Sequence, residues 1–131
     1  MRDRPLVLVV EDEIELNDLE RQLLALYGLD SVPAYTGTEA LNKAEECNAD
    51  TIILDLMLPE LDGFETCKRL RERNGRRVPI VVVSALDDAP SRHRASKAGA
   101  DAYFSKPFDT QALMTKVWDL VHKPEGAPGP A

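Results

Sequence analysis

Five short apolar runs alternate with longer segments of helical spacing, and this alternation restricts the fold more than any other feature of the sequence. Such runs, rich in Val, Ile and Leu and bounded by polar or turn residues, are typical of buried strands. Strands that alternate with helices predict a parallel sheet with right-handed crossovers. The expected strands cover residues 6–10, 31–35, 51–54, 79–83 and 102–105.

Helices are expected between these strands and after the last one, over residues 14–27, 36–46, 62–73, 90–99 and 109–121. Thr36 and Glu39 form a capping-box pattern, and Gly28 marks the end of the first helix. That helix carries an apolar stripe that we expect to face the core, made of Leu16, Leu19, Leu23, Leu26 and Tyr27. Segment 90–99 has almost no apolar stripe, so little should hold its helix against the sheet.

The composition of each run indicates its place in the sheet. Residues 6–10 and 80–83 are the most apolar and belong in the interior, where helices cover both faces. Pro33 cannot donate a ladder hydrogen bond, so its strand belongs at an edge. We therefore expect an α/β fold of the flavodoxin-like (βα)5 type, with a five-stranded parallel sheet in the strand order 2-1-3-4-5. In that order, ligands bind at the carboxyl ends of the strands, near strands one and three.

Charged and hydroxyl side chains stand at this edge. Glu11 and Asp12 follow the first strand, Asp55 the third, Ser84 the fourth and Lys106 the fifth. Converging carboxylates repel one another unless a cation intervenes, and oxygen ligands favour Mg²⁺ or Mn²⁺. A lysine adds a compact positive charge suited to phosphate oxygens. Each residue alone is explained as a cap or a solvated charge, but together they fit phosphoryl transfer onto Asp55.

Size and composition exclude several classes of protein. The 131 residues suffice for one domain, expected over residues 1–123, and residues 124–131 read as a Pro/Gly-rich tail or linker. A net charge of −7 argues against direct nucleic-acid binding, and no apolar run is long enough to cross a membrane. Cys47 and Cys67 lack metal-ligand spacing and are expected to be buried thiols of a cytoplasmic protein.

In their order and spacing, these motifs resemble the receiver domain of two-component response regulators over about residues 6–121. The matching motifs are Glu11-Asp12, Asp55-Leu56-Met57-Leu58-Pro59 with Asp62-Gly63, Ser84-Ala85, and Lys106-Pro107-Phe108. The resemblance implies a signalling module, not an enzyme, that takes a phosphoryl group onto Asp55. The donor would be a phosphohistidine on a histidine kinase or histidine phosphotransfer protein. Phosphorylation would switch a surface that binds a downstream protein target or a detached effector domain.

The resemblance also implies how a cofactor would bind. Mg²⁺ (or Mn²⁺) would be held directly by Asp12 and Asp55, through water by Glu11, and by the backbone carbonyl of Met57. Lys106 would pair with one phosphoryl oxygen.

Further residues match the switching parts of the family. Ser84 would hydrogen-bond another phosphoryl oxygen, together with the backbone amide of Ala85. Tyr103 matches the aromatic residue that turns inward as Ser84 moves, although an aromatic residue in the last strand also packs against a neighbouring helix. The Lys106-Pro107 peptide bond is expected to be cis.

The Asp55–Phe64 region is similar to receivers that dimerise through the fourth helix, fifth strand and fifth helix to drive DNA-binding domains. Ala102, Lys116 and Trp118 stand where that subgroup has an acidic residue and arginines, which argues against this dimer. We expect either a single-domain regulator or a receiver cut from a longer protein at its tail.

Three other functions fit parts of the pattern. A phosphatase of the haloacid dehalogenase class would need a second aspartate where Met57 stands. A flavin-binding module of the same fold would need a hydroxyl- and glycine-rich phosphate loop in place of residues 11–17. A phosphorylation-independent docking domain would not need the acidic residues at all.

Met57 and Leu86, two residues beyond Asp55 and Ser84, cannot orient an attacking water, so slow self-dephosphorylation is expected.

Overall fold

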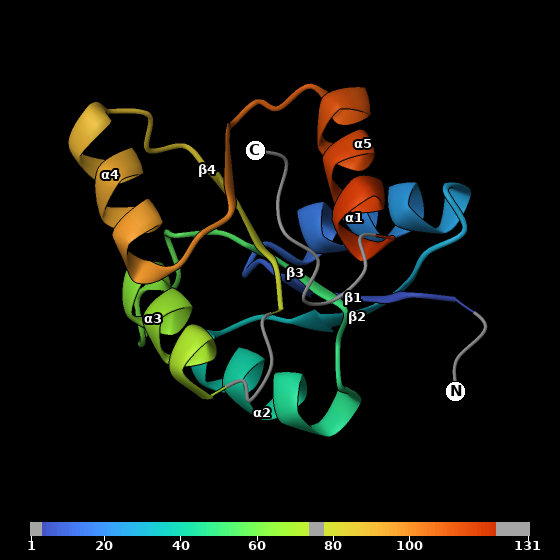
Figure 1. Ribbon diagram of the computed structural model, residues 1–131, viewed down its shortest axis with the longest axis horizontal. Coiled ribbons are helices and arrows are strands. Elements are labelled where there is room, and N and C mark those ends of the chain that lie inside the picture. The colour runs from blue at the N-terminus through green and yellow to red at the C-terminus, as the bar shows by residue number, and fades with distance from the viewer. Residues whose placement is uncertain (1–3, 74–77, 123–131) are drawn as a thin grey trace.

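Figure 1 shows the computed structural model of the chain, which describes residues 4–73 and 78–122. One parallel sheet has the strand order β2-β1-β3-β4-β5. The strands are β1 (Leu6–Val10), β2 (Asp30–Ala34), β3 (Thr51–Leu54), β4 (Ile80–Ser84) and β5 (Ala102–Ser105). The helices are α1 (Ile14–Leu26), α2 (Gly37–Cys47), α3 (Gly63–Arg73), α4 (Ala89–Ala98) and α5 (Thr110–Val121). The predicted flavodoxin-like fold and its strand order are confirmed.

Helices cover both faces of the sheet. Helices α1 and α5 lie on one face, and α2, α3 and α4 lie on the other (Figure 1). Successive residues of a strand point to opposite faces, so Val7 and Val9 pack toward the α1–α5 layer and Leu8 and Val10 toward the other. This explains why β1 and β4 are apolar at nearly every position. Strand β2, which contains Pro33, forms an edge, as predicted.

The register of the sheet aligns the strand ends that carry the site. Val10 of β1 pairs with Leu54 of β3. The N–H group of Asp55 donates to the Val10 carbonyl at 3.0 Å, and the N–H group of Glu11 donates to the Ala34 carbonyl at 3.0 Å. Glu11 and Asp55 therefore leave neighbouring strands side by side.

Element boundaries differ from the prediction by about one residue, because terminal residues depend on local hydrogen bonds. Strand β2 begins at Asp30, and β4 includes Ser84. Thr36 caps α2 by accepting a hydrogen bond from the N–H group of Glu39 at 3.0 Å, as its capping-box pattern predicted. Helix α4 buries only Ala95, which confirms that it is weakly anchored.

The orientation of α1 differs from the prediction. Its buried residues are Asn17, Glu20 and Leu24. Leu19 and Leu26, which were expected in the core stripe, are 48% and 82% exposed. The helix therefore presents two polar side chains to the core and much of its leucine stripe outward. The prediction was wrong because hydrophobic periodicity shows that a helix has an apolar face but does not show that this face packs against the sheet.

The linker-like tail expected at 124–131 lies outside the described residues. The domain boundary after residue 123 thus stays a prediction. Within the two described ranges, no helix has the length and apolar character needed to cross a membrane.

Candidate functional site

Side chains from three strand ends meet at the carboxyl edge of the sheet. The Nζ atom of Lys106, directly after β5, lies 2.6 Å from Oε1 of Glu11 and 3.0 Å from Oδ2 of Asp55. Glu11 and Asp55 follow β1 and β3 and are only 2% and 5% exposed. Of the five residues that the topology was expected to gather at this edge, Lys106 therefore contacts two directly, Glu11 and Asp55.

Asp12 adds an exposed carboxylate to this group. One oxygen from each of Glu11, Asp12 and Asp55 lies within 4.8 Å of the others. Within the described part of the chain, the ion pairs of these three acids are those of Lys106 with Glu11 and Asp55. Three carboxylates thus share one cation, and their oxygen atoms suit a hard divalent ion such as Mg²⁺ or Mn²⁺.

Burial and mutual repulsion shift the ionisation of the site. Burial raises the pKa of Glu11 to about 7, and the charge of Asp55 acts in the same direction while Lys106 opposes it. Burial by itself lowers the pKa of Lys106, but hydrogen bonds to the two carboxylates outweigh it, and the net pKa of Lys106 is raised. The lysine is therefore held in its charged form between the two acids.

A further buried carboxyl group, Glu20, was missed by sequence reasoning. It lies on the inner face of α1 and is 1% exposed. Burial raises the pKa of Glu20 to about 8, with the charge of Glu11 as the next cause. Glu20 is therefore mostly neutral near pH 7. Nothing in the sequence marked it, because a helical glutamate next to an arginine ordinarily faces solvent.

The loop after β3 fixes the carboxylate of Asp55. Its Oδ1 atom accepts a hydrogen bond from the N–H group of Met57 at 3.0 Å. Gly63 packs directly behind this loop, and its N–H group donates to the Leu56 carbonyl at 2.9 Å. A Cβ atom on Gly63 would lie 2.2 Å from the Leu56 Cα atom, so only glycine fits there. The Met57 side chain is 55% exposed, and the metal-binding role of its carbonyl stays a prediction.

The end of β4 carries the predicted hydroxyl group. Ser84 is fully buried, and its Oγ atom accepts a hydrogen bond from the N–H group of Leu86 at 3.2 Å. The Ser84 carbonyl accepts from the N–H group of Lys106 at 2.9 Å, which ties the ends of β4 and β5 together. Ala85 follows Ser84 and is exposed. The Lys106-Pro107 peptide bond is cis, as expected.

Tyr103 of β5 belongs to a polar cluster that sequence reasoning did not identify. The Tyr103 hydroxyl donates to the Leu86 carbonyl, and the guanidinium carbon of Arg92 lies 4.6 Å from the ring centroid. Arg92 also donates to Oδ1 of Asp87 at 2.9 Å and to Oγ of Ser105 at 2.8 Å. We call Asp87, Arg92, Tyr103 and Ser105 the α4 latch. It joins the β4–α4 loop and α4 to β5.

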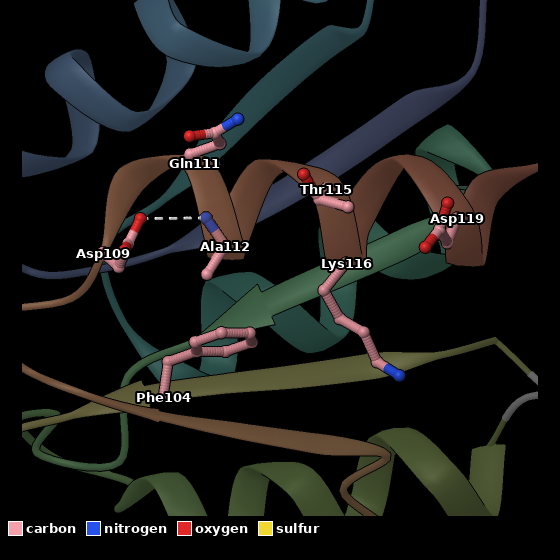
Figure 2. A pocket seen from close by; sticks show the side chains of 7 residues that line it. All are labelled: Phe104, Asp109, Gln111, Ala112, Thr115, Lys116 and Asp119. Atoms are coloured by element: carbon pink, nitrogen blue, oxygen red, sulfur yellow. Dashed lines mark hydrogen bonds between the residues drawn. The ribbon is translucent and has the colours of Figure 1, made fainter.

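A separate hollow of about 500 Å³ lies between β5 and α5 (Figure 2). Phe104 lines it from the strand, and Ala112 and Lys116 line it from the helix. None of the three acids or Lys106 lines it, so it is not part of the acid cluster. It lies on the β5–α5 part of the surface that was considered for dimerisation.

Comparisons with known proteins agree with this fold. The family described as "Response regulator receiver domain" matches residues 7–118. The alkaline phosphatase synthesis transcriptional regulatory protein PhoP of Bacillus subtilis (strain 168) is 38% identical over 119 residues, covering 91% of this chain and 49% of that protein. Response regulator MprA of Mycobacterium bovis (strain BCG / Pasteur 1173P2) is 37% identical over 123 residues, covering 92% of this chain and 53% of that protein.

Solved structures give the same result. The Francisella response regulator 1452 receiver domain superposes with a TM-score of 0.84 at 34% identity, covering 90% of this chain and 97% of that one. The Vibrio cholerae chemotaxis protein CheY4 has a TM-score of 0.83 at 27% identity, covering 89% of this chain and 98% of that one. The chain belongs to the response regulator receiver domain family, the phospho-accepting signalling modules of two-component systems. It spans about half the length of the curated relatives named above.

Proposed function

We propose that this receiver accepts a phosphoryl group on Asp55 from a phosphohistidine of a histidine kinase or histidine phosphotransfer protein. The observation that carries the proposal is the contact of Lys106 with both Asp55 and Glu11 at the edge of the sheet where this fold binds ligands. A nucleophilic carboxylate beside a cation is the arrangement that phosphoryl transfer requires.

In the transfer step, a carboxylate oxygen of Asp55 forms a bond to phosphorus as the phosphorus–nitrogen bond of the phosphohistidine breaks. The electron pair of that bond returns to the imidazole nitrogen of the donor. Lys106 lies 3.0 Å from Oδ2 of Asp55, so its charge would stabilise a phosphoryl oxygen there. The Ser84 hydroxyl and the Ala85 amide would donate hydrogen bonds to the remaining oxygens.

Mg²⁺ (or Mn²⁺) is the proposed cofactor. Asp12 and Asp55 would bind it directly, Glu11 would bind it through water, and the Met57 carbonyl would be a further ligand. The proposal is supported by the close approach of the three carboxylates, whose oxygens lie within 4.8 Å of one another. When bound, the ion supplies positive charge that reduces repulsion between these acids and the incoming phosphoryl group.

Phosphorylation would then change the surface formed by α4 and β5. A phosphoryl group adds about −1.5 to −2 charge, by analogy with other phosphorylated side chains. If Ser84 turns to the phosphoryl group, its hydrogen bond to the Leu86 N–H group is lost. Tyr103 is bound to the carbonyl of Leu86 and would move with it. Helix α4 buries only Ala95, so its apolar packing offers little resistance to this rearrangement.

The altered surface would bind a downstream protein target or a detached effector domain. Direct nucleic-acid binding is not proposed, because the net charge is −7. A dimer through α4, β5 and α5 is not part of the proposal, because Ala102, Lys116 and Trp118 replace the acid and arginines of the subgroup that uses it.

We further propose a cytoplasmic receiver module over residues 1–123 with a linker at 124–131. A reducing compartment suits Cys67, a buried thiol whose pKa burial raises to about 11. The thiol form of this residue is therefore the stable one in the fold.

Intact-mass measurement after incubation with acetyl phosphate tests the proposed acceptor. We expect the wild-type protein to gain one phosphoryl group with Mg²⁺ present and none after chelation with EDTA. Asp55→Asn should abolish the gain. Asp62→Asn is the matched control, because Asp62 caps α3 through Oδ1 and is exposed. A phosphorylated Asp55→Asn variant, or an unmodified wild-type protein, would overturn the proposal.

A further inference from the structure

Asn17 is a buried polar residue that the proposed phosphoryl-transfer site does not use. It lies on the inner face of α1 and is fully buried. Buried asparagine is uncommon, and an apolar side chain would fill the same space, so packing alone does not require an amide there. The hydrogen bonds of this amide show what it does.

The Asn17 side chain binds the main chain on both sides of Glu11. Its Nδ2 atom donates to the carbonyls of Val9 and Glu11, each at 3.1 Å, and lies 3.4 Å from the carbonyl of Ala34. The Ala34 carbonyl also accepts from the N–H group of Glu11 at 3.0 Å. Asn17, Ala34 and Glu11 thus form a closed ring of hydrogen bonds where the chain leaves β1 for the acid pair.

Arg21 sets the orientation of this amide. Its Nε atom donates to Oδ1 of Asn17 at 2.8 Å, which leaves the NH₂ group facing the strand ends. Arg21 is itself paired with Asp18 on the outer side of the helix. A connected set of hydrogen bonds therefore runs from the surface of α1 to the backbone of Glu11.

We propose that Asn17, oriented by Arg21, is a positioning residue that fixes Glu11 and Asp12 for cation binding. This inference rests on the proposed function, because the acid pair is the cation-binding part of that site. A metal site requires its oxygen ligands within a few tenths of an ångström of their ideal places. Without the amide, the carbonyls of Val9 and Glu11 each lose a hydrogen bond, and the backbone must shift to regain it. That shift displaces the acids that follow.

Calorimetric titration of the full chain with MgCl₂ alone tests the role. We expect Asn17→Leu to raise the Mg²⁺ dissociation constant about tenfold or more, the usual effect of removing a residue that orients metal ligands. Leu24→Ala is the matched control, because Leu24 is buried on the same face of α1 and makes none of these hydrogen bonds. It should lower the stability of the fold and leave the dissociation constant unchanged.

Two further measurements separate positioning from a structural role. Arg21→Met changes a side chain that is 25% exposed, so it tests the network without a core substitution, and it should weaken Mg²⁺ binding by a smaller factor. In acetyl phosphate assays, Asn17→Leu should raise the half-saturating Mg²⁺ concentration while the rate at saturating Mg²⁺ recovers.

The outcomes are distinguishable. Wild-type-like Mg²⁺ affinity in both Asn17→Leu and Arg21→Met, or an equal loss in Leu24→Ala, would overturn the positioning role alone. Absence of Mg²⁺ binding by the wild-type protein would overturn the proposed function and this role with it.

Discussion

The Nζ atom of Lys106 and the Oδ2 atom of Asp55 lie 3.0 Å apart, although 51 positions separate the two residues in the chain. The contact exists because β3 and β5 are parallel and end at the same edge, on either side of β4. Breaking a largely buried ion pair by removing one partner leaves an uncompensated charge, so the lysine and the acids depend on each other.

Replacing Lys106 tests this dependence. Lys106→Met keeps the aliphatic part of the side chain and removes its positive charge. The transferred phosphoryl group would then lose the charge of Lys106. We expect phosphorylation by acetyl phosphate at saturating Mg²⁺ to slow by about a hundredfold or more. The time course of intact mass measures this rate. Lys116→Met, the same change on the exposed side of α5, should react like the wild-type protein. A normal rate in Lys106→Met would remove the lysine from the site.

Substitution of Gly63 should damage the fold and the site together. A Cβ atom there would lie 2.2 Å from the Cα atom of Leu56 and 2.7 Å from the carbonyl oxygen of Asp55. Because these neighbours are backbone atoms, they cannot rotate away. We expect Gly63→Ala to lower the free energy of unfolding by about 2 kcal/mol or more in urea titrations.

Gly28 provides the comparison for that substitution. It has a φ of +78° but nothing within 4 Å of its would-be Cβ atom, so Gly28→Ala meets backbone strain without a clash. Gly28→Ala should lower the free energy of unfolding by about 1 kcal/mol and leave phosphorylation by acetyl phosphate normal. Equal effects of the two substitutions would contradict the steric explanation.

Much of this molecule could be predicted from its sequence because both faces of the sheet are covered. Covered strands are continuous apolar runs, which made residues 6–10 and 80–83 recognisable as interior strands, and Pro33 identified an edge. Once the strand order was known, Glu11, Asp55 and Lys106 were expected at one edge of the sheet, since parallel strands end at the same edge.

The features that sequence reasoning missed depend on tertiary contacts between elements. The buried face of α1 carries Leu24 together with Asn17, whose amide donates to carbonyls at the end of β1, and the leucine pattern did not reveal this face. In the α4 latch, Arg92 of α4 donates directly to Ser105 of β5. This contact depends on how the β4–α4 loop positions the helix, which no periodicity in the sequence predicts. A polar side chain is buried where it finds hydrogen-bond partners, and the pattern of apolar residues does not show where those partners lie.

The α4 latch should restrain the β4–α4 loop in the unphosphorylated protein. Arg92→Ala removes the contact with the Tyr103 ring and the hydrogen bonds to Asp87 and Ser105. We expect amide hydrogen exchange in the loop and in α4 to accelerate roughly threefold, as loss of a partly exposed cation–π contact allows. Mass spectrometry of peptic fragments measures this change.

Arg94 supplies the control on the same helix. Its guanidinium carbon lies 4.0 Å from the ring centroid of Phe64, away from the latch. Arg94→Ala should leave exchange in the β4–α4 loop unchanged. If both variants accelerated it equally, general loosening of α4 would replace the latch as the explanation.

The phosphorylated protein should lose its phosphoryl group slowly. Met57, two residues after Asp55, is 55% exposed and has no group that could orient a water molecule. Met57→Gln introduces such a group and should shorten the phosphoryl lifetime by about tenfold. Decay of the phosphorylated mass after removal of acetyl phosphate gives the lifetime, and Met57→Leu should match the wild-type protein. A wild-type lifetime of only seconds would be inconsistent with this role.

Glu20 should make the stability of the protein depend on pH. Its pKa is about 8 in the fold, compared with the ordinary value of 4.5. Because the folded pKa is the higher one, the associated stability is fully present below pH 4.5 and is lost as the pH rises through about 8. The free energy of unfolding should therefore fall by on the order of 4 kcal/mol between about pH 5 and about pH 9. Glu11, whose pKa is raised to about 7, acts in the same direction.

Glu20→Gln isolates this contribution, because the amide has the shape of the carboxyl group and stays neutral. Urea titrations should show that the variant loses less stability than the wild-type protein as the pH rises, so that it becomes relatively more stable above about pH 8. The pH dependence that remains should come mainly from Glu11. Glu15→Gln, on the exposed side of the same helix, should keep the full wild-type dependence. Parallel curves for Glu20→Gln and the wild-type protein would show that Glu20 does not hold a proton in the fold.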